Sequence, residues 1–213
     1  MLVIATHNAH KTDEIRAMLG DLAEQVTDLT QFPDIAPADE TGTTFVANAT
    51  IKALAACEAL PAGTWALADD SGLEVDALDG APGIYSARYS GEGATDATNR
   101  EKLLRELEAA QARGKERSAR FRCVLVLARN GEVVASCDGS VEGIITNEEK
   151  GDGGFGYDPL FVPEGHCATF AELSADVKNS LSHRARAVEA LRQIIADRNL
   201  SLNYGEAPHS VNA

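Results

Sequence analysis

The sequence predicts an α/β fold with a mixed β-sheet flanked by helices. Short apolar runs typical of strands alternate along the chain with amphipathic runs typical of helices. Two long strand-like runs, 118–129 and 132–145, are separated by Asn130-Gly131, a pair that favours a two-residue hairpin turn. Residues 123–128 are apolar on both faces, as in a central strand covered on each side.

The elements before this hairpin alternate between strands and helices. Their expected ranges are a strand over 2–5, a helix ended by Gly20, a strand over 25–29, a helix from Thr43 or Thr44 to Leu60, a strand over 65–68 and a helix from Asp96 to Ala112. The inward residues recur at helical spacing, and they are Ile15, Met18, Leu19 and Leu22 in the first helix, Phe45, Ala49, Ala53 and Ala56 in the second, and Leu103, Leu104 and Leu107 in the third.

The elements after the hairpin are a glycine-rich loop over 151–159, a strand over 160–162 and a last helix capped by Ser182. The inward face of that helix is expected to hold Val188, Leu191 and Ile195. Residues 1–200 are expected to form one domain, and 201–213 a weakly ordered tail.

Composition and charge exclude several classes of protein. The chain has 213 residues, of which 44% are hydrophobic and 24% charged, as in a globular protein. Its 33 acidic and 19 basic side chains give a net charge of −14, which argues against binding of duplex nucleic acid or anionic lipid. No apolar run approaches the roughly 20 residues that span a bilayer, and no export signal is expected. A small polyanionic ligand would need locally placed cations or a divalent metal.

The cysteines predict no disulfide and no metal site. Their positions, without any C-x-x-C pair, are Cys57, Cys123, Cys137 and Cys167. The hairpin register places Cys123 and Cys137 on opposite faces of the sheet, where they cannot bond. We expect all four to be small buried hydrophobic residues in a reducing, cytoplasmic compartment.

The first candidate segment, Thr6 to Lys11, follows a strand and opens a helix. Backbone N–H groups at a helix start, the polar side chains of Thr6 and Asn8 and the charge of Lys11 suit a polyanion. The alternative is a plain N-cap followed by a solvated lysine. The segment lacks the G-x-x-x-x-G-K pattern of a Walker loop.

The second candidate segment begins with Asp69-Asp70, expected in a loop after a strand. Two adjacent carboxylates are costly unless a cation lies beside them, and oxygen ligands of this kind suit Mg²⁺. Glu40 is a further candidate ligand in the loop before the second helix. The alternative is an acidic surface turn.

The third and fourth candidate segments lie in the last third of the chain. Phe155 or Tyr157, in the loop Gly153–Pro159, can stack on a flat ligand or else fill the core. His183 and Arg184 occupy the first turn of the last helix, against the usual dipole preference, which indicates an anion or acceptor nearby. Two further groups of cations are read as solvated side chains, and these are Lys52 and the cluster Arg113, Lys115, Arg117, Arg120 and Arg122.

Taken together, the segments resemble the inosine/xanthosine triphosphate pyrophosphatase family over nearly the whole chain. The motifs that carry the resemblance are Thr6-x-Asn8-x-x-Lys11, Glu40-Thr-Gly, Asp69-Asp-Ser-Gly-Leu-x-Val-Asp76, the block from Gly80 to Gly91, Gly154-Phe-Gly-Tyr-Asp-Pro-x-Phe161 and Ser182-His-Arg184. Each is weak evidence alone, but six in this order are specific.

The resemblance implies an elongated mixed sheet with two lobes and the active cleft between them, usually in a homodimer. It also implies Mg²⁺-dependent hydrolysis of ITP, dITP and XTP to the monophosphate and pyrophosphate. The alternatives are a pyrophosphatase for other standard or modified nucleotides and a non-catalytic purine nucleotide sensor.

The resemblance also implies roles for single residues. The triphosphate would be bound by Thr6, Asn8 and Lys11, assisted by Lys52. The metal would be held by Glu40 and Asp70. Asp70 would be the general base, with Asp69 beside it. The purine pocket would be Phe155, Gly156, Tyr157 and Asp158, and the remaining substrate contacts would be Ser71, Lys178, His183 and Arg184.

Two positions depart from the family pattern. His7 stands where a glycine is common, which affects how closely the loop approaches phosphate. Ala47 stands where an acidic residue is common, which weakens the ligand assignment near Glu40.

Overall fold

The computed structural model describes residues 1–22 and 25–202, and its chain divides into two compact units. Unit 1 comprises Met1–Asp70, Val124–Asp138 and the chain from Arg186 onward. Unit 2 comprises Ser71–Cys123 and Gly139–Ala185. Each unit is described by itself below.

Six strands form one sheet in the order β2-β1-β3-β4-β5-β6. Their bounds are Leu2–Ile4 (β1), Val26–Asp28 (β2), Trp65–Val75 (β3), Ser118–Arg129 (β4), Glu132–Ile145 (β5) and Phe161–Pro163 (β6). β1 pairs in parallel with both β2 and β3, whereas β5 and β6 are antiparallel. The sheet is therefore mixed, as predicted, and the bounds of β4 and β5 match the expected ranges.

Five α-helices accompany the sheet within the described ranges, and their bounds are Ala9–Leu19 (α1), Phe45–Ala59 (α2), Asp96–Ala109 (α3), Ala175–Leu181 (α4) and His183–Asp197 (α5). The sequence did not predict α4, because seven residues are too few to show an amphipathic period. α3 ends before Ala112, since Gln111 takes a left-handed φ of 55°. No helix in the described ranges is both long enough and apolar enough to cross a membrane.

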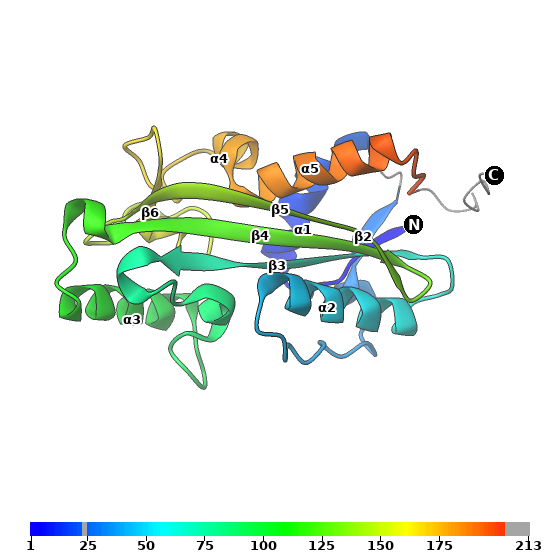
Figure 1. Ribbon diagram of the computed structural model, residues 1–213, viewed down its shortest axis with the longest axis horizontal. Helices are drawn as coiled ribbons and strands as arrows, with labels where there is room; N and C mark the ends of the chain where they lie inside the picture. Colours follow the sequence, from blue (N-terminus) through cyan, green and yellow to red (C-terminus); the bar gives the residue numbers. More distant parts are fainter. Residues whose placement is uncertain (23–24, 203–213) are drawn as a thin grey trace. The chain divides into compact units, whose positions relative to one another are not determined.

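Unit 1 packs α2 and α5 on opposite sides of the strands (Figure 1). The predicted faces of both helices are buried, with Ala49, Ala53 and Ala56 from α2 and Val188, Leu191 and Ile195 from α5. Residues 124–128 of β4 are each at most 5% exposed, which confirms a central strand covered on both sides. In α1 the buried face is Thr12, Ile15 and Leu19, whereas Met18 and Leu22 are only partly buried.

The expected ends of two helices are confirmed by their caps. The Thr44 hydroxyl accepts the backbone N–H of Ala47 at 3.2 Å and begins α2. The Ser182 hydroxyl accepts the backbone N–H of Ala185 at 3.2 Å at the start of α5. These bonds satisfy N–H groups that a helix start leaves without partners.

Unit 2 is built on an aromatic core. The Phe121 ring meets the Phe161 ring edge-on, with 4.7 Å between centroids, and stacks on the Phe170 ring at 6.0 Å. Leu103 and Leu107 of α3 are fully buried in the same core. Leu104, also expected inward, packs against this core while partly buried.

Two expectations about local structure were wrong. Asp69-Asp70 lies inside β3 and not in a loop after a short strand, because Leu73 and Val75 extend the buried strand past the two acids. Cys167 is exposed in the turn after β6, and Cys57 and Cys137 are only partly buried. Of the expected tail, Ser201 and Leu202 are described: Leu202 is 2% exposed, and Ser201 accepts a hydrogen bond from the Trp65 indole at 3.0 Å. Residues 203–213 lie outside the described residues.

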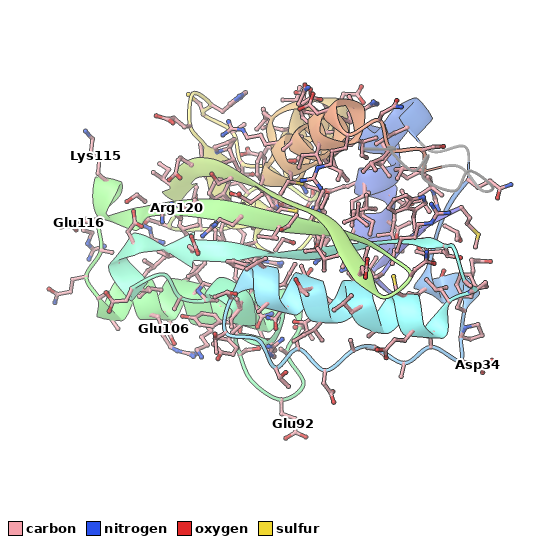
Figure 2. All side chains as sticks on the ribbon, turned by 45° about the vertical axis from the view of Figure 1, so that its right-hand side comes forward. Asp34, Glu92, Glu106, Lys115, Glu116 and Arg120 are labelled. Carbon is pink, nitrogen blue, oxygen red and sulfur yellow. The ribbon has the colours of Figure 1, made fainter. Side chains whose placement is uncertain are left out.

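The basic cluster near the start of β4 was read as solvated, and this is wrong for Arg117. Its side chain is buried, and its guanidinium donates to the carbonyl oxygens of Ile145 at 2.8 Å and Thr146 at 2.6 Å. Arg120, on β4, instead forms ion pairs with Asp76 and Glu142 (Figure 2). Arg117 therefore completes the backbone hydrogen bonding where β5 ends.

We predict that Arg117→Met lowers the free energy of unfolding by roughly 2–4 kcal/mol, because two buried carbonyl oxygens lose a charged donor. Lys115→Met is the matched control, since Lys115 is exposed and points away from the ribbon (Figure 2), and we expect it to change stability by less than about 0.5 kcal/mol. Urea denaturation followed by circular dichroism measures both, and equal midpoints for the two variants would refute a structural role for Arg117.

Candidate active site

The turn from β1 into α1 places polar groups at a helix start. The Asn8 side-chain oxygen accepts the backbone N–H groups of His10 at 3.0 Å and Lys11 at 3.3 Å. The Thr6 hydroxyl accepts the backbone N–H of Asn8 at 3.1 Å. Thr6 and Asn8 therefore shape the turn as an N-cap, and His7 between them is exposed.

Lys11, however, is not the solvated lysine of a plain N-cap. Its ammonium donates to the carboxylate of Asp69, whose side chain is fully buried. The sheet explains this pairing: Ile4, the last residue of β1, pairs with Leu67, so Asp69 lies just beyond the carboxyl end of β1, where the turn starts. Ligand sites of parallel sheets lie at such strand ends.

Asp70 takes a different lysine. Lys52, on α2, donates to Asp70 Oδ1 at 2.7 Å and to Glu40 Oε1 at 3.2 Å. Successive side chains of a strand point to opposite faces, so the adjacent acids of β3 pair with separate cations. The expectation of a solvated Lys52 is wrong, because its side chain is 13% exposed.

Burial and ion pairing together set the pKa values in this cluster. Burial raises the pKa of Asp70; Lys52 lowers it in part, and Glu40 raises it again. Burial acts to lower the pKa of Lys52, but Asp70, Asp69 and Glu40 together outweigh it and the net pKa is raised. Asp69 and Lys11 also contribute electrostatically to these two pKa values, which makes the five side chains one electrostatic cluster.

The oxygen atoms of this cluster fit a divalent cation. Asp70 is 5% exposed, and its Oδ2 atom is buried without a hydrogen-bond partner. Lys52 already shows that Asp70 and Glu40 together hold a cation. Within residues 1–22 and 25–202, no three or more His, Cys, Asp and Glu side chains form a metal-binding group. The two carboxylates of Asp70 and Glu40 suit Mg²⁺, which binds one or two protein carboxylates together with water and phosphate oxygens.

Asn48 holds the loop that carries Glu40, a role that no sequence pattern indicated. Asn48 is fully buried on α2, and its Oδ1 atom accepts the Gly42 backbone N–H at 2.8 Å. A Cβ at Gly42 would lie 2.6 Å from that oxygen, so the loop can approach α2 only with glycine there. Ala47 adjoins this contact without contributing a ligand.

Unit 2 holds the glycine-rich loop over 153–158. Asp158 is 3% exposed, and its carboxylate accepts hydrogen bonds from the Phe155 backbone N–H at 2.9 Å and from the Lys178 ammonium at 2.6 Å. Gly154 has a φ of 69°, and a Cβ there would lie 2.1 Å from Asp158 Oδ2. Glycine at 154 is therefore required for Asp158 to close the loop.

The Phe155 ring is held by two cations. Lys178 Nζ lies 4.8 Å and Arg184 Cζ lies 5.9 Å from the ring centroid. Arg184 is 1% exposed, and its guanidinium donates to the Ser71 hydroxyl at 3.0 Å. These two cation–π contacts fix the position of the Phe155 ring.

Two candidate residues place their rings in the core of unit 2. Tyr157 is 4% exposed and donates from its hydroxyl to the Ser86 carbonyl at 2.9 Å. His183 stacks on Phe121 with 4.9 Å between centroids. Of the two sequence alternatives for Tyr157, the structure shows the core-filling one.

Two side chains of α3 form hydrogen bonds with the backbone N–H and carbonyl of Gly156. These contacts were not expected from the sequence. Its N–H donates to Asp96 at 2.7 Å, and its carbonyl accepts the Arg100 guanidinium at 2.8 Å. Asp96 and Arg100 are one helical turn apart, so they lie on the same face of α3. That spacing was visible in the sequence, but nothing in it indicated a partner some 60 residues away.

We predict that Asp96→Asn speeds amide exchange at Gly156 about tenfold, because a charge-assisted hydrogen bond becomes a neutral one. NMR-detected exchange measures this effect. Glu101→Gln removes an exposed acid from the same helix and is the control, for which we expect no change at Gly156. Equal exchange in all three proteins would show that Asp96 does not restrain the loop.

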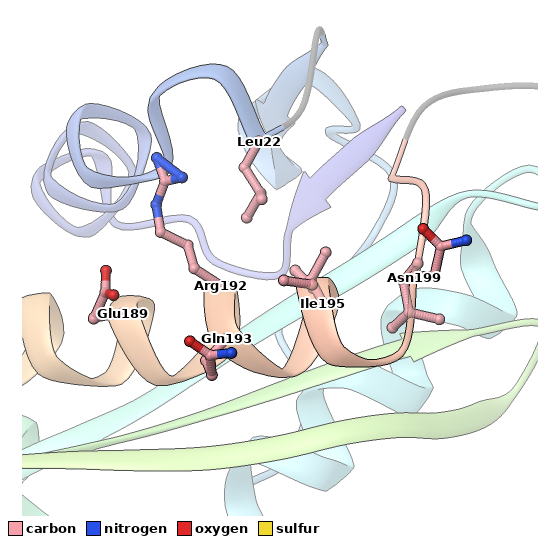
Figure 3. A pocket seen from close by; sticks show the side chains of 8 residues that line it. Leu22, Glu189, Arg192, Gln193, Ile195 and Asn199 are labelled. Carbon is pink, nitrogen blue, oxygen red and sulfur yellow. The ribbon is translucent and has the colours of Figure 1, made fainter.

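A separate pocket of about 610 Å³ lies in unit 1 between α5 and Leu22 (Figure 3). The Arg192 guanidinium, at its edge, donates to the Leu19 carbonyl at 2.9 Å and so joins α5 to the end of α1. None of the candidate residues lines this pocket.

Known proteins match this chain over most of its length. A family model described as the Ham1 family matches residues 2–194. A protein of Desulforamulus reducens named dITP/XTP pyrophosphatase is 48% identical over 194 residues, 91% of this chain and 94% of that protein. A protein of the same name from Halalkalibacterium halodurans is 49% identical over 189 residues, 89% and 95% of the two chains. The solved structure of a HAM1 protein from Coxiella burnetii superposes with a TM-score of 0.81 at 44% identity, covering 92% of this chain and 98% of that one.

Proposed function

The chain belongs to the Ham1 family, and on that premise we propose that it hydrolyses the non-standard purine nucleoside triphosphates ITP, dITP and XTP to the monophosphate and pyrophosphate. The activity for which its relatives are named supports this reaction. The observation that carries the proposal is the partly buried cluster of Lys11, Lys52, Glu40, Asp69 and Asp70, which combines cations for phosphate with carboxylates for a metal.

Unit 1 supplies groups that suit the polyanionic end of such a substrate. A nucleoside triphosphate has a polyanionic end and a flat aromatic end. In unit 1 the start of α1, with Thr6, Asn8 and Lys11, suits the phosphates, and Lys52 adds a second ammonium. In a chain of net charge −14, phosphate affinity depends on these locally placed cations.

Magnesium is the proposed cofactor, with Glu40 and Asp70 as its ligands from the protein. The unpartnered Oδ2 of Asp70 supports this assignment. When bound, the ion would neutralise charge on the phosphate oxygens and lower the pKa of a coordinated water. Asn48 would keep Glu40 in place through the Gly42 backbone.

Asp70 is the proposed general base. Water attacks the α-phosphorus, its proton passes to the Asp70 carboxylate, and the bond from the α-phosphorus to the bridging oxygen breaks to release pyrophosphate. Burial favours this role, because a carboxylate with a raised pKa is a stronger base. Asp69 is less suited, since its side chain is fully buried and paired with Lys11, whereas Asp70 keeps one carboxylate oxygen without a partner.

The purine is assigned to unit 2. We propose that the base stacks near Phe155 and that Arg184 donates to the 6-oxo group of hypoxanthine or xanthine. The backbone at Gly156 and Asp158, together with Lys178 and Ser71, fixes the positions of these two side chains. The 6-amino group of adenine cannot accept that hydrogen bond and would leave a buried donor unsatisfied, a penalty of roughly 1–3 kcal/mol. Tyr157 and His183 act from the core, by packing beneath the site.

We also propose a homodimer in the cytoplasm. None of the four cysteines, all within the described ranges, forms a disulfide, which supports a reducing compartment, and the resemblance supports the dimer. Light scattering of the purified protein tests the oligomeric state.

The reaction is tested by incubating the protein with ITP, dITP, XTP, ATP and GTP, with and without Mg²⁺, and identifying the products. We expect pyrophosphate and the monophosphate from the first three, at least about tenfold slower turnover of ATP, and loss of turnover with chelator. Release of orthophosphate, or equal rates on ATP, would reject the proposal. Saturable binding without turnover in Mg²⁺ would identify a nucleotide sensor instead.

Asp70→Asn is expected to fold and to lose at least about 10²-fold in kcat, the scale of general-base loss. Asp13→Asn provides the matched control, because the Asp13 side chain is 76% exposed on α1, and its kcat should stay at the wild-type value. Near-wild-type turnover by Asp70→Asn, in a sample whose circular dichroism is native, would remove Asp70 from the reaction.

A further inference from the structure

We propose that Lys52 is the resident counter-cation of the divalent metal site, and that a metal ion binds there only as the Lys52 ammonium leaves Glu40 and Asp70. The position of the metal site rests on the proposed function. Without a metal ion Lys52 holds Glu40 and Asp70 together, and it leaves them when the ion binds.

The contacts of Lys52 are those of a bridging cation. Its Nζ atom lies 2.7 Å from Asp70 Oδ1 and 3.2 Å from Glu40 Oε1, which come from β3 and from the loop before α2. All three side chains are shielded, with exposed fractions of 13% for Lys52, 7% for Asp70 and 27% for Glu40. One ammonium therefore links two carboxylates that would otherwise repel one another.

Lys52 leaves one oxygen of Asp70 without a partner. Asp70 Oδ2 is buried and accepts no hydrogen bond, although a buried carboxylate oxygen normally has a partner. A single ammonium brings one positive charge to two carboxylates, whereas a divalent ion brings two. A metal ion held at Asp70 Oδ2 would share one carboxylate with the Lys52 ammonium at Oδ1, and at that short separation in a shielded site the two cations would repel strongly.

Lys11 is not displaced in this proposal. Lys11 belongs to the same electrostatic cluster, but the structure pairs its ammonium with Asp69, which is not a proposed ligand. A metal ion on Glu40 and Asp70 can therefore leave the Lys11–Asp69 pair intact, while it must displace Lys52.

Displacement couples the metal to the nucleotide. A buried ammonium that leaves two carboxylates needs new acceptors, and phosphate oxygens are suitable ones. The metal ion alone must break the ion pairs of Lys52 without this compensation. We therefore expect weak metal binding without nucleotide and stronger binding with it.

The test measures Mn²⁺ binding without nucleotide, by electron paramagnetic resonance of the free ion, in the wild type, Lys52→Met and Lys11→Met. Both variants lose one positive charge from the same cluster, so they differ in which carboxylates they release. We expect Lys52→Met to bind Mn²⁺ at least about tenfold more tightly than the wild type, and Lys11→Met to change by less than about threefold.

A second readout is thermal: Mn²⁺ should raise the melting temperature of Lys52→Met by several degrees more than that of the wild type. Should Lys52→Met fail to fold, Lys52→Gln and the charge-preserving Lys52→Arg replace it. We expect Lys52→Gln to bind Mn²⁺ more tightly than the wild type and Lys52→Arg to show no such gain.

Equal gains in Lys52→Met and Lys11→Met would show general electrostatics and overturn the inference. Unchanged or weaker Mn²⁺ binding in Lys52→Met would overturn it as well. Neither measurement uses a nucleotide, so a protein that binds Mn²⁺ as expected but does not hydrolyse ITP would reject the proposed function and keep this inference.

Discussion

The candidate site depends on one constraint, which is that buried carboxylates must have cations beside them. Asp69 and Asp70 are adjacent and almost completely shielded from water. Such a pair is stable because each acid has its own lysine, Lys11 from α1 and Lys52 from α2. The ion pairs thus join β3 to the helices on which the phosphate-binding groups lie.

The position of these acids follows from the topology. β1 is only three residues long and its partner β3 has eleven, so β3 continues beyond the last pair, Ile4 with Leu67. Asp69 and Asp70 occupy that continuation, beside the turn that starts α1. Because β3 extends beyond the end of β1, the two aspartates, the N-cap of α1 and Lys11 lie close together without any long loop.

Local sequence signals predicted much of this structure correctly. The Asn130-Gly131 turn fixed the ends of β4 and β5, and Thr44 fixed the start of α2, because hairpin turns and helix caps depend on a few adjacent residues. Glu40, the two aspartates and Lys11 were also singled out, whereas Lys52 was read as a solvated side chain. What local signals missed was the partner of each group. Asp70 was read as part of a loop because aspartate disfavours strands, yet a lysine 18 residues away stabilises it within one.

The same limitation explains the missed supporting residues. Arg117 and Arg100 look like ordinary surface arginines in the sequence, and only the backbone carbonyls that they bind, 28 and 56 residues away, reveal their roles. Asn48 carries no signal apart from its place on a helix that is otherwise largely apolar. A polar side chain becomes structural through a distant partner, and such partners are set by the tertiary fold.

The charges of the cluster show why a strongly acidic chain suits a metal-dependent reaction on a polyanion. Two lysines and three carboxylates meet there, so the cluster has a net charge of −1 and repels a triphosphate. A divalent cation changes that sum to +1. A phosphate chain would then meet a positive site only after the metal has arrived, with Lys52 released toward the same phosphates. Under the proposed function, the excess of one carboxylate over the lysines would therefore make the affinity for nucleotide depend on the metal.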